Sequence, residues 1–190
     1  MSDDGSSPFH VVWDPTPDAF GVPQTIFGRR DEEFYGAIGR IAGLSALIEY
    51  QALTIYQTMK NAAQTTDTQL SASQLLEKAF KEFKELAPVG DDADRHVLFQ
   101  YYSDVKTILR ARNDYIHNLW PAQPGEALFG WRPNPDKTNR ADQPTTTTQT
   151  SMDELRAFIL QLVELVRRRD TTYVAACALQ DVRIRGGVTS

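Results

Sequence analysis

The sequence has a single cysteine, Cys177, among its 190 residues. One thiol cannot form a disulfide within the chain, which excludes a disulfide-stapled scaffold and favours a reducing compartment. Apolar runs are also short: none approaches the ~18 residues of a membrane-spanning helix, and no basic segment followed by an apolar one marks a secretory signal. We therefore predict a cytoplasmic protein with no membrane partner.

An excess of positive charge is also missing. The 25 acidic and 20 basic residues give a formal net charge of −5, which argues against a broad nucleic-acid-binding surface. A local basic site remains compatible with this balance, because residues 95 to 120 carry four positive and two negative charges. The hydrophobic content of 41% is enough for one domain with a sizeable core.

Proline is nearly absent from the middle of the chain. Of ten prolines, four lie within residues 1 to 30 and five within 121 to 144, which leaves only Pro88 between them. Proline interrupts helices, so this distribution divides the chain. The predicted segments are an extended or partly disordered arm over 1 to 30, a helical domain over 31 to 183 with an insert at 121 to 150, and a tail over 184 to 190.

Four segments of the domain have apolar residues at steps of three and four, as amphipathic helices do. The predicted helices cover about residues 31 to 63, 71 to 87 and 91 to 118, and a fourth begins at the capping box Ser151 to Glu154 and continues beyond Ala176. Gly36, Gly39 and Gly43 weaken the first helix, which would make sense if another helix crossed closely there.

The insert between the last two helices has a different pattern. Residues 127 to 132 are strand-like, 133 to 139 are rich in turn residues, and 145 to 148 could form a return strand. The predicted fold is therefore all-α, with four main helices and a short β-hairpin or irregular insert between the last two.

Polar residues accumulate where the third helix ends, in residues 110 to 120. Lys106, Arg110, Asn113 and His117 follow one another at steps of four, three and four, so they share one helix face. Arg112 instead occupies a position that the apolar periodicity assigns to the core. An unpaired buried charge is costly, so we expect Arg112 to have a carboxylate partner or to open onto a cleft or a subunit interface.

This stretch resembles the HEPN superfamily, whose motif is an Arg, a polar residue, a few more residues and a His. Arg112, Asn113 and His117 occupy those positions, with four residues between Arg and His. The resemblance covers the order of elements over about residues 31 to 180 and individual residues only over 110 to 120. It implies an all-α nucleotide-binding domain, in many families a metal-independent endoribonuclease that pairs two motifs across a dimer cleft.

An Arg and a His without a carboxylate cluster suit cleavage of RNA by its own 2′-hydroxyl, with no metal or other cofactor. His117 is the candidate acid/base, because imidazole titrates near neutrality. Arg112 is the candidate contact to the phosphate, and Asn113 would orient the imidazole or touch the substrate. On an ideal helix Arg112 and His117 lie roughly 140° apart, so they share one phosphate only if the helix end unwinds or a second subunit contributes.

Three further residues are candidates for binding the substrate. Lys106 and Arg110 lie on the polar face that ends in His117, and Trp120 would stack on a base. Four of the candidates also have a purely structural alternative: His117 as a helix-terminal residue, Arg112 as an ion pair at the core's rim, Asn113 as a surface amide and Trp120 as packing.

The predicted function is that of an endoribonuclease leaving 2′,3′-cyclic phosphate and 5′-hydroxyl ends. The expected setting is a toxin or antiviral defence effector, a homodimer with the site at its interface, and an antitoxin or regulatory protein as partner. One alternative is a catalytically silent HEPN dimer that binds nucleotide or RNA or serves as a scaffold. Another is a helical interaction protein in which the motif is accidental.

Overall fold

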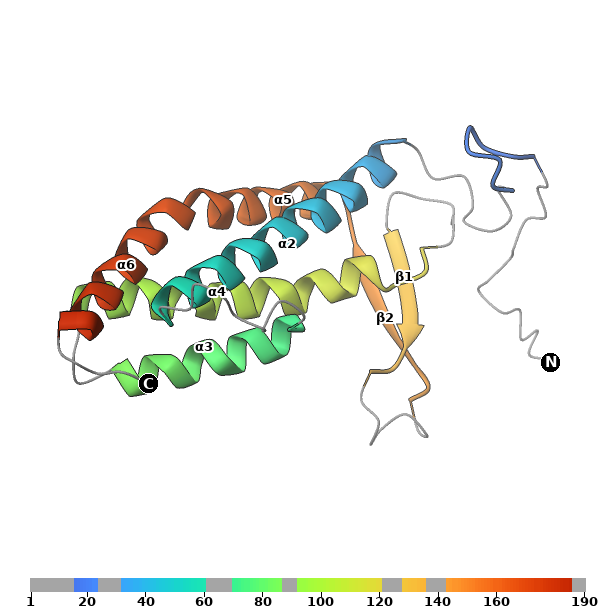
Figure 1. Cartoon of the computed structure of the whole chain (residues 1–190). Coiled ribbons are helices and arrows are strands. Elements are labelled where there is room, and N and C mark those ends of the chain that lie inside the picture. The colour runs from blue at the N-terminus through green and yellow to red at the C-terminus, as the bar shows by residue number, and fades with distance from the viewer. Residues whose placement is uncertain are drawn as a thin grey trace.

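Most of the described chain is helical, as the periodicity predicts. The computed structural model describes residues 16–23, 32–60, 70–86, 92–120, 128–135 and 143–185. Its elements are α2 (Glu32–Met59), α3 (Ala72–Leu86), α4 (Asp92–Ile116), β1 (Leu128–Pro133), β2 (Thr145–Thr150), α5 (Met152–Arg167) and α6 (Arg169–Arg185). In Figure 1, α2 and α5 run side by side, α4 crosses the middle of the bundle, α3 lies below it, and the hairpin closes one end.

The core forms where α2 meets α4, α5 and α6. The seam of α2, which consists of the residues at alternating steps of four and three from Phe34 to Met59, is buried along the whole helix, except that Ile38 is only partly buried. Its buried members are Phe34, Ile41, Ser45, Ile48, Ala52, Ile55 and Met59. Each large side chain among them stabilises the fold by about 1.5–3 kcal/mol relative to exposure, so this one helix supports much of the domain.

A close helix crossing at the glycines of α2 is not found among the described residues. A Cβ added at Gly39 or Gly43 would meet nothing within 4 Å, and one at Gly36 would meet only the Arg40 guanidinium at 2.8 Å. The prediction of a close crossing is therefore wrong for the described part of the chain, because α2 turns this side toward solvent.

Two adjacent tyrosines of α4, Tyr101 and Tyr102, lie in the core and differ in the hydrogen bonding of their hydroxyl groups. The Tyr102 hydroxyl donates to the Ala52 carbonyl on α2 at 2.7 Å, whereas the Tyr101 hydroxyl has no hydrogen-bond partner among the described residues. Burial raises the pKa of Tyr101 from 10.0 to about 12, partly offset by Arg168 and Arg169. Burial also raises the pKa of Tyr102 well above its ordinary value.

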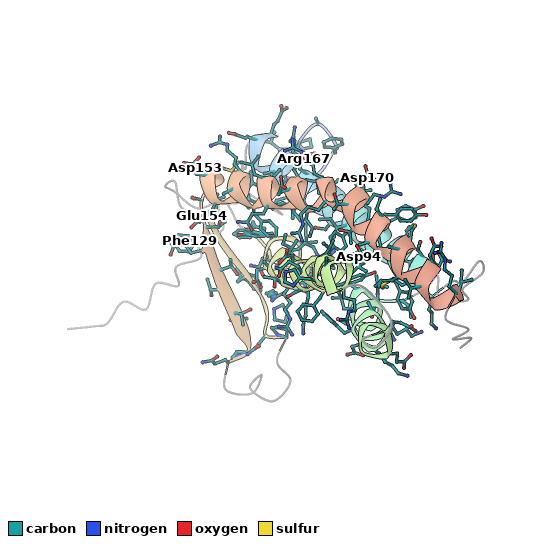
Figure 2. The ribbon with its side chains drawn as sticks, turned by 90° about the vertical axis from the view of Figure 1, so that its left-hand side faces the viewer. Asp94, Phe129, Asp153, Glu154, Arg167 and Asp170 are labelled. Atoms are coloured by element: carbon teal, nitrogen blue, oxygen red, sulfur yellow. The ribbon has the colours of Figure 1, made fainter. Side chains whose placement is uncertain are left out.

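The fourth predicted helix begins correctly but is not continuous. The Ser151 amide donates to the Glu154 carboxylate at 2.8 Å and the Glu154 amide donates to the Ser151 hydroxyl at 3.2 Å, which is the predicted capping box. Arg168 separates α5 from α6, and Figure 2 shows the bend between the labelled Arg167 and Asp170. The Arg168 guanidinium donates to Asp104 of α4 at 2.5 Å, so a tertiary contact holds the residue between the two helices to α4.

The predicted hairpin is present and is joined to the end of α4. β1 pairs with β2 in antiparallel register from Leu128 opposite Thr150 to Pro133 opposite Thr145. On the other edge of β1, the backbones of Trp131 and Leu119 exchange hydrogen bonds of 2.8 and 3.0 Å. The hairpin thereby holds the segment that follows α4.

The predicted terminal segments are described only in part. Residues 1–15 and 24–30 of the arm, residue 31 at the start of the predicted domain, and residues 186–190 of the tail lie outside the described residues. Within the arm, residues 16–23 form a turn in which the Asp18 carboxylate accepts from the amides of Phe20 and Val22. Helix α6 continues through Arg185. Among the described helices, none has the length and apolar character needed to cross a membrane.

The two tyrosines give a paired test of the α2–α4 contact. Tyr101→Phe removes a buried hydroxyl without a partner, so the free energy of unfolding should stay unchanged or rise by up to ~1 kcal/mol, whereas Tyr102→Phe should lower it by about 1 kcal/mol. Urea unfolding at pH 7 measures both changes, and a larger loss for Tyr101→Phe would contradict the packing.

Alkaline pH provides a second readout of the same tyrosines. A phenol whose pKa is raised in the folded state makes its full contribution to the free energy of unfolding below the unfolded pKa of 10.0. This contribution decreases as the pH rises toward about 12. Unfolding midpoints should therefore fall between these pH values in the wild type and fall less in Tyr101→Phe. Equal slopes for the two proteins would contradict the burial of this hydroxyl.

Candidate functional site

The polar C-terminal end of α4 is helical almost as far as the end that the sequence predicts, at residue 118. The helix ends at Ile116, two residues before the predicted end, because Leu119 pairs in extended conformation with Trp131. The His117 amide still donates to the Asn113 carbonyl at 3.2 Å. His117 therefore lies one turn beyond Asn113, with its side chain exposed.

A pocket of about 420 Å³ lies between α3 and α4. Its charged residues are Lys106, Arg110, Arg112 and Glu77, so three cations meet one carboxylate. The remaining lining residues are Ser71, Ala72, Ser73, Leu76, Phe80, Leu109 and Asn113. The pocket thus combines an apolar floor with local positive charge in a protein of net charge −5.

The N-terminus of α3 forms one wall of this pocket. The Ser71 amide donates to the Gln74 side-chain oxygen at 2.9 Å, and the Gln74 amide donates to the Ser71 hydroxyl at 3.3 Å. This reciprocal cap holds the first turn in place while the helix dipole adds partial positive charge at the same end. Ser71 and Ser73 are functional candidates that the sequence prediction missed, although the Ser-x-x-Gln pattern marked the cap.

Lys106 lies across the aromatic wall of the pocket. Its ammonium nitrogen is 5.9 Å from the centre of the Phe80 ring, which packs edge-on against Phe99. A cation over a ring face is attracted by the ring's negative face. The contact keeps the Lys106 charge beside the pocket.

Arg112 has the carboxylate partner that its position required. Its guanidinium lies 3.1 Å from Glu49 of α2, and the two side chains are 22% and 33% exposed. The same arginine also lines the pocket, while its Nε is buried without a hydrogen-bond partner in the part of the chain that the structure describes. Both expectations, an ion pair and an opening onto a cleft, therefore hold for one side chain.

His117 is not among the residues that line the pocket. The structure brings Lys106, Arg110, Arg112 and Asn113 together and leaves His117 one turn further along, past the helix end. Within one chain, the predicted phosphate contact and the predicted acid/base thus do not face the same pocket.

Trp120 is held within the junction between α4 and the hairpin. Its indole N–H donates to the Tyr115 carbonyl at 2.9 Å, and its ring packs edge-on against Phe34. A Cβ at Gly130 would lie 2.8 Å from this ring, so glycine permits the close approach. The structure therefore places Trp120 in packing; its predicted role in base stacking stays a prediction.

Arg132 fastens β1 to the last turns of α4. Its guanidinium donates to the Asp114 carboxylate at 2.6 Å and to the Asn113 carbonyl at 3.0 Å. Asp114 is therefore used to position the hairpin. Among the described residues, no three His, Cys, Asp or Glu side chains gather where they could hold a metal ion.

Comparison with known proteins finds no match. No protein-family model matches the sequence, and neither a curated protein nor a solved structure matches it. The resemblance to HEPN domains consequently depends on the motif and on the order of elements predicted from the sequence.

The Arg112–Glu49 pair can be measured by a double-mutant cycle. Both side chains are partly exposed, so the coupling free energy between Arg112→Ala and Glu49→Ala should be about 0.5–1 kcal/mol in urea unfolding and should shrink in high salt. Arg156 and Glu33, an exposed pair joining α5 to α2, provide a control cycle with a coupling nearer zero. Additive losses at Arg112 and Glu49 would show that the pair contributes no measurable stability.

Proposed function

We propose that this protein is an HEPN-like, metal-independent endoribonuclease that holds an RNA phosphate in the pocket between α3 and α4. The observation that carries the proposal is the convergence of Lys106, Arg110 and Arg112 on one pocket whose opposite wall is the N-terminus of α3. Guanidinium groups and helix N-termini both favour phosphate oxygens. In a chain of net charge −5, such a concentration of positive charge favours an anionic ligand.

The shape of the pocket supports a nucleotide as the bound unit. Its volume of about 420 Å³ lies within the range of small-ligand sites, roughly 300–1,000 Å³. Phe80, Leu76 and Leu109 offer an apolar surface to a ribose or base, while the cations and Asn113 offer polar contacts to a phosphate. RNA is the proposed polymer because the motif chemistry uses the 2′-hydroxyl.

In the proposed reaction His117 takes the proton from the 2′-hydroxyl, whose oxygen attacks the adjacent phosphorus. The bond to the 5′-oxygen breaks, and that oxygen leaves as a hydroxyl after accepting a proton. Arg112 stabilises the negative charge on the phosphate oxygens as the new bond forms, through its fork of donors. The products are a 2′,3′-cyclic phosphate and a 5′-hydroxyl.

A second subunit completes the site in this proposal. His117 is not among the residues that line the pocket of its own chain, and a homodimer with α4 near its axis would bring His117 of one subunit to the pocket of the other. The further parts of the proposal are a role as a toxin or antiviral defence effector and control by an antitoxin or regulatory protein. The resemblance of Arg112, Asn113 and His117 to the HEPN motif supports these roles.

The second candidate function is a silent nucleotide- or RNA-binding domain. It is favoured by the ion pair between Arg112 and Glu49, which occupies part of the guanidinium, and by the absence of His117 from the pocket lining. In this case the same pocket would bind the phosphate without cleaving the chain.

Cleavage of total RNA in excess EDTA tests the first candidate. The wild type should produce 2′,3′-cyclic phosphate ends and spare DNA, which lacks the hydroxyl. His117→Ala should lose on the order of 10²-fold or more in rate at unchanged thermal stability, and Arg112→Lys should recover little of the loss in Arg112→Ala. His96→Ala, which changes an exposed histidine of α4, is the matched control and should cleave normally.

The outcomes separate the candidates. Bound RNA without cleavage would support the silent binder, and neither binding nor cleavage would support an interaction protein with an accidental motif. Cleavage that EDTA abolishes would contradict the proposed mechanism.

Binding of a short single-stranded RNA tests the pocket itself. Lys106→Ala and Arg110→Ala should each weaken binding by about five- to tenfold at ~0.1 M salt and lower the slope of log K against log salt by about 0.7, the share of one phosphate contact. Lys81→Ala is the control, because Lys81 is exposed on α3 and outside the pocket lining. Equal losses in all three variants would indicate diffuse electrostatic attraction and would contradict a phosphate site in the pocket.

A further inference from the structure

The outer edge of β2 presents backbone groups to which the described chain offers no partner. The Asn134 amide donates to the Pro144 carbonyl at 2.9 Å, which identifies this pair as hydrogen-bonded across the hairpin. Bonded pairs alternate along an antiparallel ladder, so the next bonded residues of β2 are Thr146, Thr148 and Thr150. The amides and carbonyls of the intervening residues, Thr145, Thr147 and Gln149, must point away from β1.

The outer sides of β1 and β2 therefore differ in backbone hydrogen bonding. β1 is paired on both sides, because Trp131 exchanges backbone hydrogen bonds with Leu119. β2 is the other edge strand, and Figure 2 shows it on the side of the hairpin away from α4. Among the described residues, no backbone partner is found on this outer side of β2.

β2 lacks the features that usually prevent edge strands from pairing. Charged side chains, an internal proline or a bulge normally serve this purpose. The six residues of β2 are five threonines and one glutamine, and its register with β1 is uninterrupted. Thr145, Thr147 and Gln149 are also exposed, so the side chains do not cover the free backbone groups.

We propose that this edge pairs with the same edge of a second copy of the chain, giving an antiparallel four-stranded sheet. A two-fold axis at Thr147 places Thr147 opposite Thr147 and Thr145 opposite Gln149. No like charges meet, and threonine pairs across strands are favourable. The strand is thus complementary to itself, whereas its lack of charge gives it no means of selecting a charged partner segment.

This contact is separate from the catalytic dimer proposed above and does not rest on it. Five strand-to-strand steps separate Leu119 of one copy from Leu119 of the other, which is about 24 Å at ~4.8 Å per step. The two motifs consequently stay apart in the edge-paired assembly. A pairing of six-residue strands buries less than ~1,000 Å², so dissociation in the micromolar range is expected.

Cysteine cross-linking tests the register directly, in a Cys177→Ala background that leaves no other thiol. Thr145→Cys and Gln149→Cys proteins should form a disulfide when mixed, because bonded pairs place Cα atoms about 5.5 Å apart, within disulfide range. Either protein alone should stay uncross-linked, since its two copies of the thiol lie about 13 Å apart, four residues along a strand. Thr147→Cys should cross-link to itself.

Cross-linking that is no greater in the mixture than in either protein alone would overturn the proposal. An independent variant, Thr147→Pro, removes an outward amide that β1 does not use, and should lower the average mass measured by light scattering at ~100 µM. Thr147→Val keeps the amide and should retain the mass of the wild type. Unchanged mass in Thr147→Pro would also overturn the proposal, and RNA cleavage by this variant should stay at the wild-type rate, which separates this test from that of the proposed function.

Discussion

The ion pair between Arg112 and Glu49 lies where the buried core of the helical bundle meets the pocket between α3 and α4. The apolar stripe of α4 is buried in the core at Leu98, Tyr101 and Val105, and at Arg112 the same stripe presents a guanidinium. A charge at such a position requires a partner, and α2 provides one 3.1 Å away. The position of the guanidinium at the pocket therefore follows from the register of α2 against α4.

The hairpin sets the position of the other half of the motif. The backbone pair between Leu119 and Trp131 draws the chain into extended conformation directly after α4. Arg132 bonds to Asp114 and Asn113, and Gly130 admits the Trp120 ring, so the end of the helix is held on several sides. His117 consequently lies past the helix end, exposed and outside the pocket of its own chain.

Much of this architecture could be predicted from local patterns. The seam of α2, the capping box at Ser151 and the strand-like residues after Ala127 depend on side-chain periodicity and turn chemistry, which the sequence displays directly. The shared face of Lys106, Arg110 and Asn113 also follows from helical spacing, and the structure brings the three into one pocket.

What could not be predicted depends on contacts between distant segments. The sequence required a partner for Arg112 without indicating Glu49, 63 positions earlier in the chain. The interruption at Arg168 has no proline or glycine to mark it in the sequence, and its contact with Asp104 joins residues 64 positions apart. The pocket needs α3 as its second wall, and the open side of α2 at Gly39 and Gly43 shows that small residues alone do not identify a helix crossing.

The central claim is that the phosphate pocket of one subunit works with His117 of another. Mixing Arg112→Ala and His117→Ala proteins, each inactive alone, tests it most directly. Random exchange of subunits should restore about a quarter of wild-type RNA cleavage, because half of the dimers are mixed and each mixed dimer has one intact site. A mixture that stays as inactive as its components, although subunit exchange is demonstrated with labelled chains, would contradict the account.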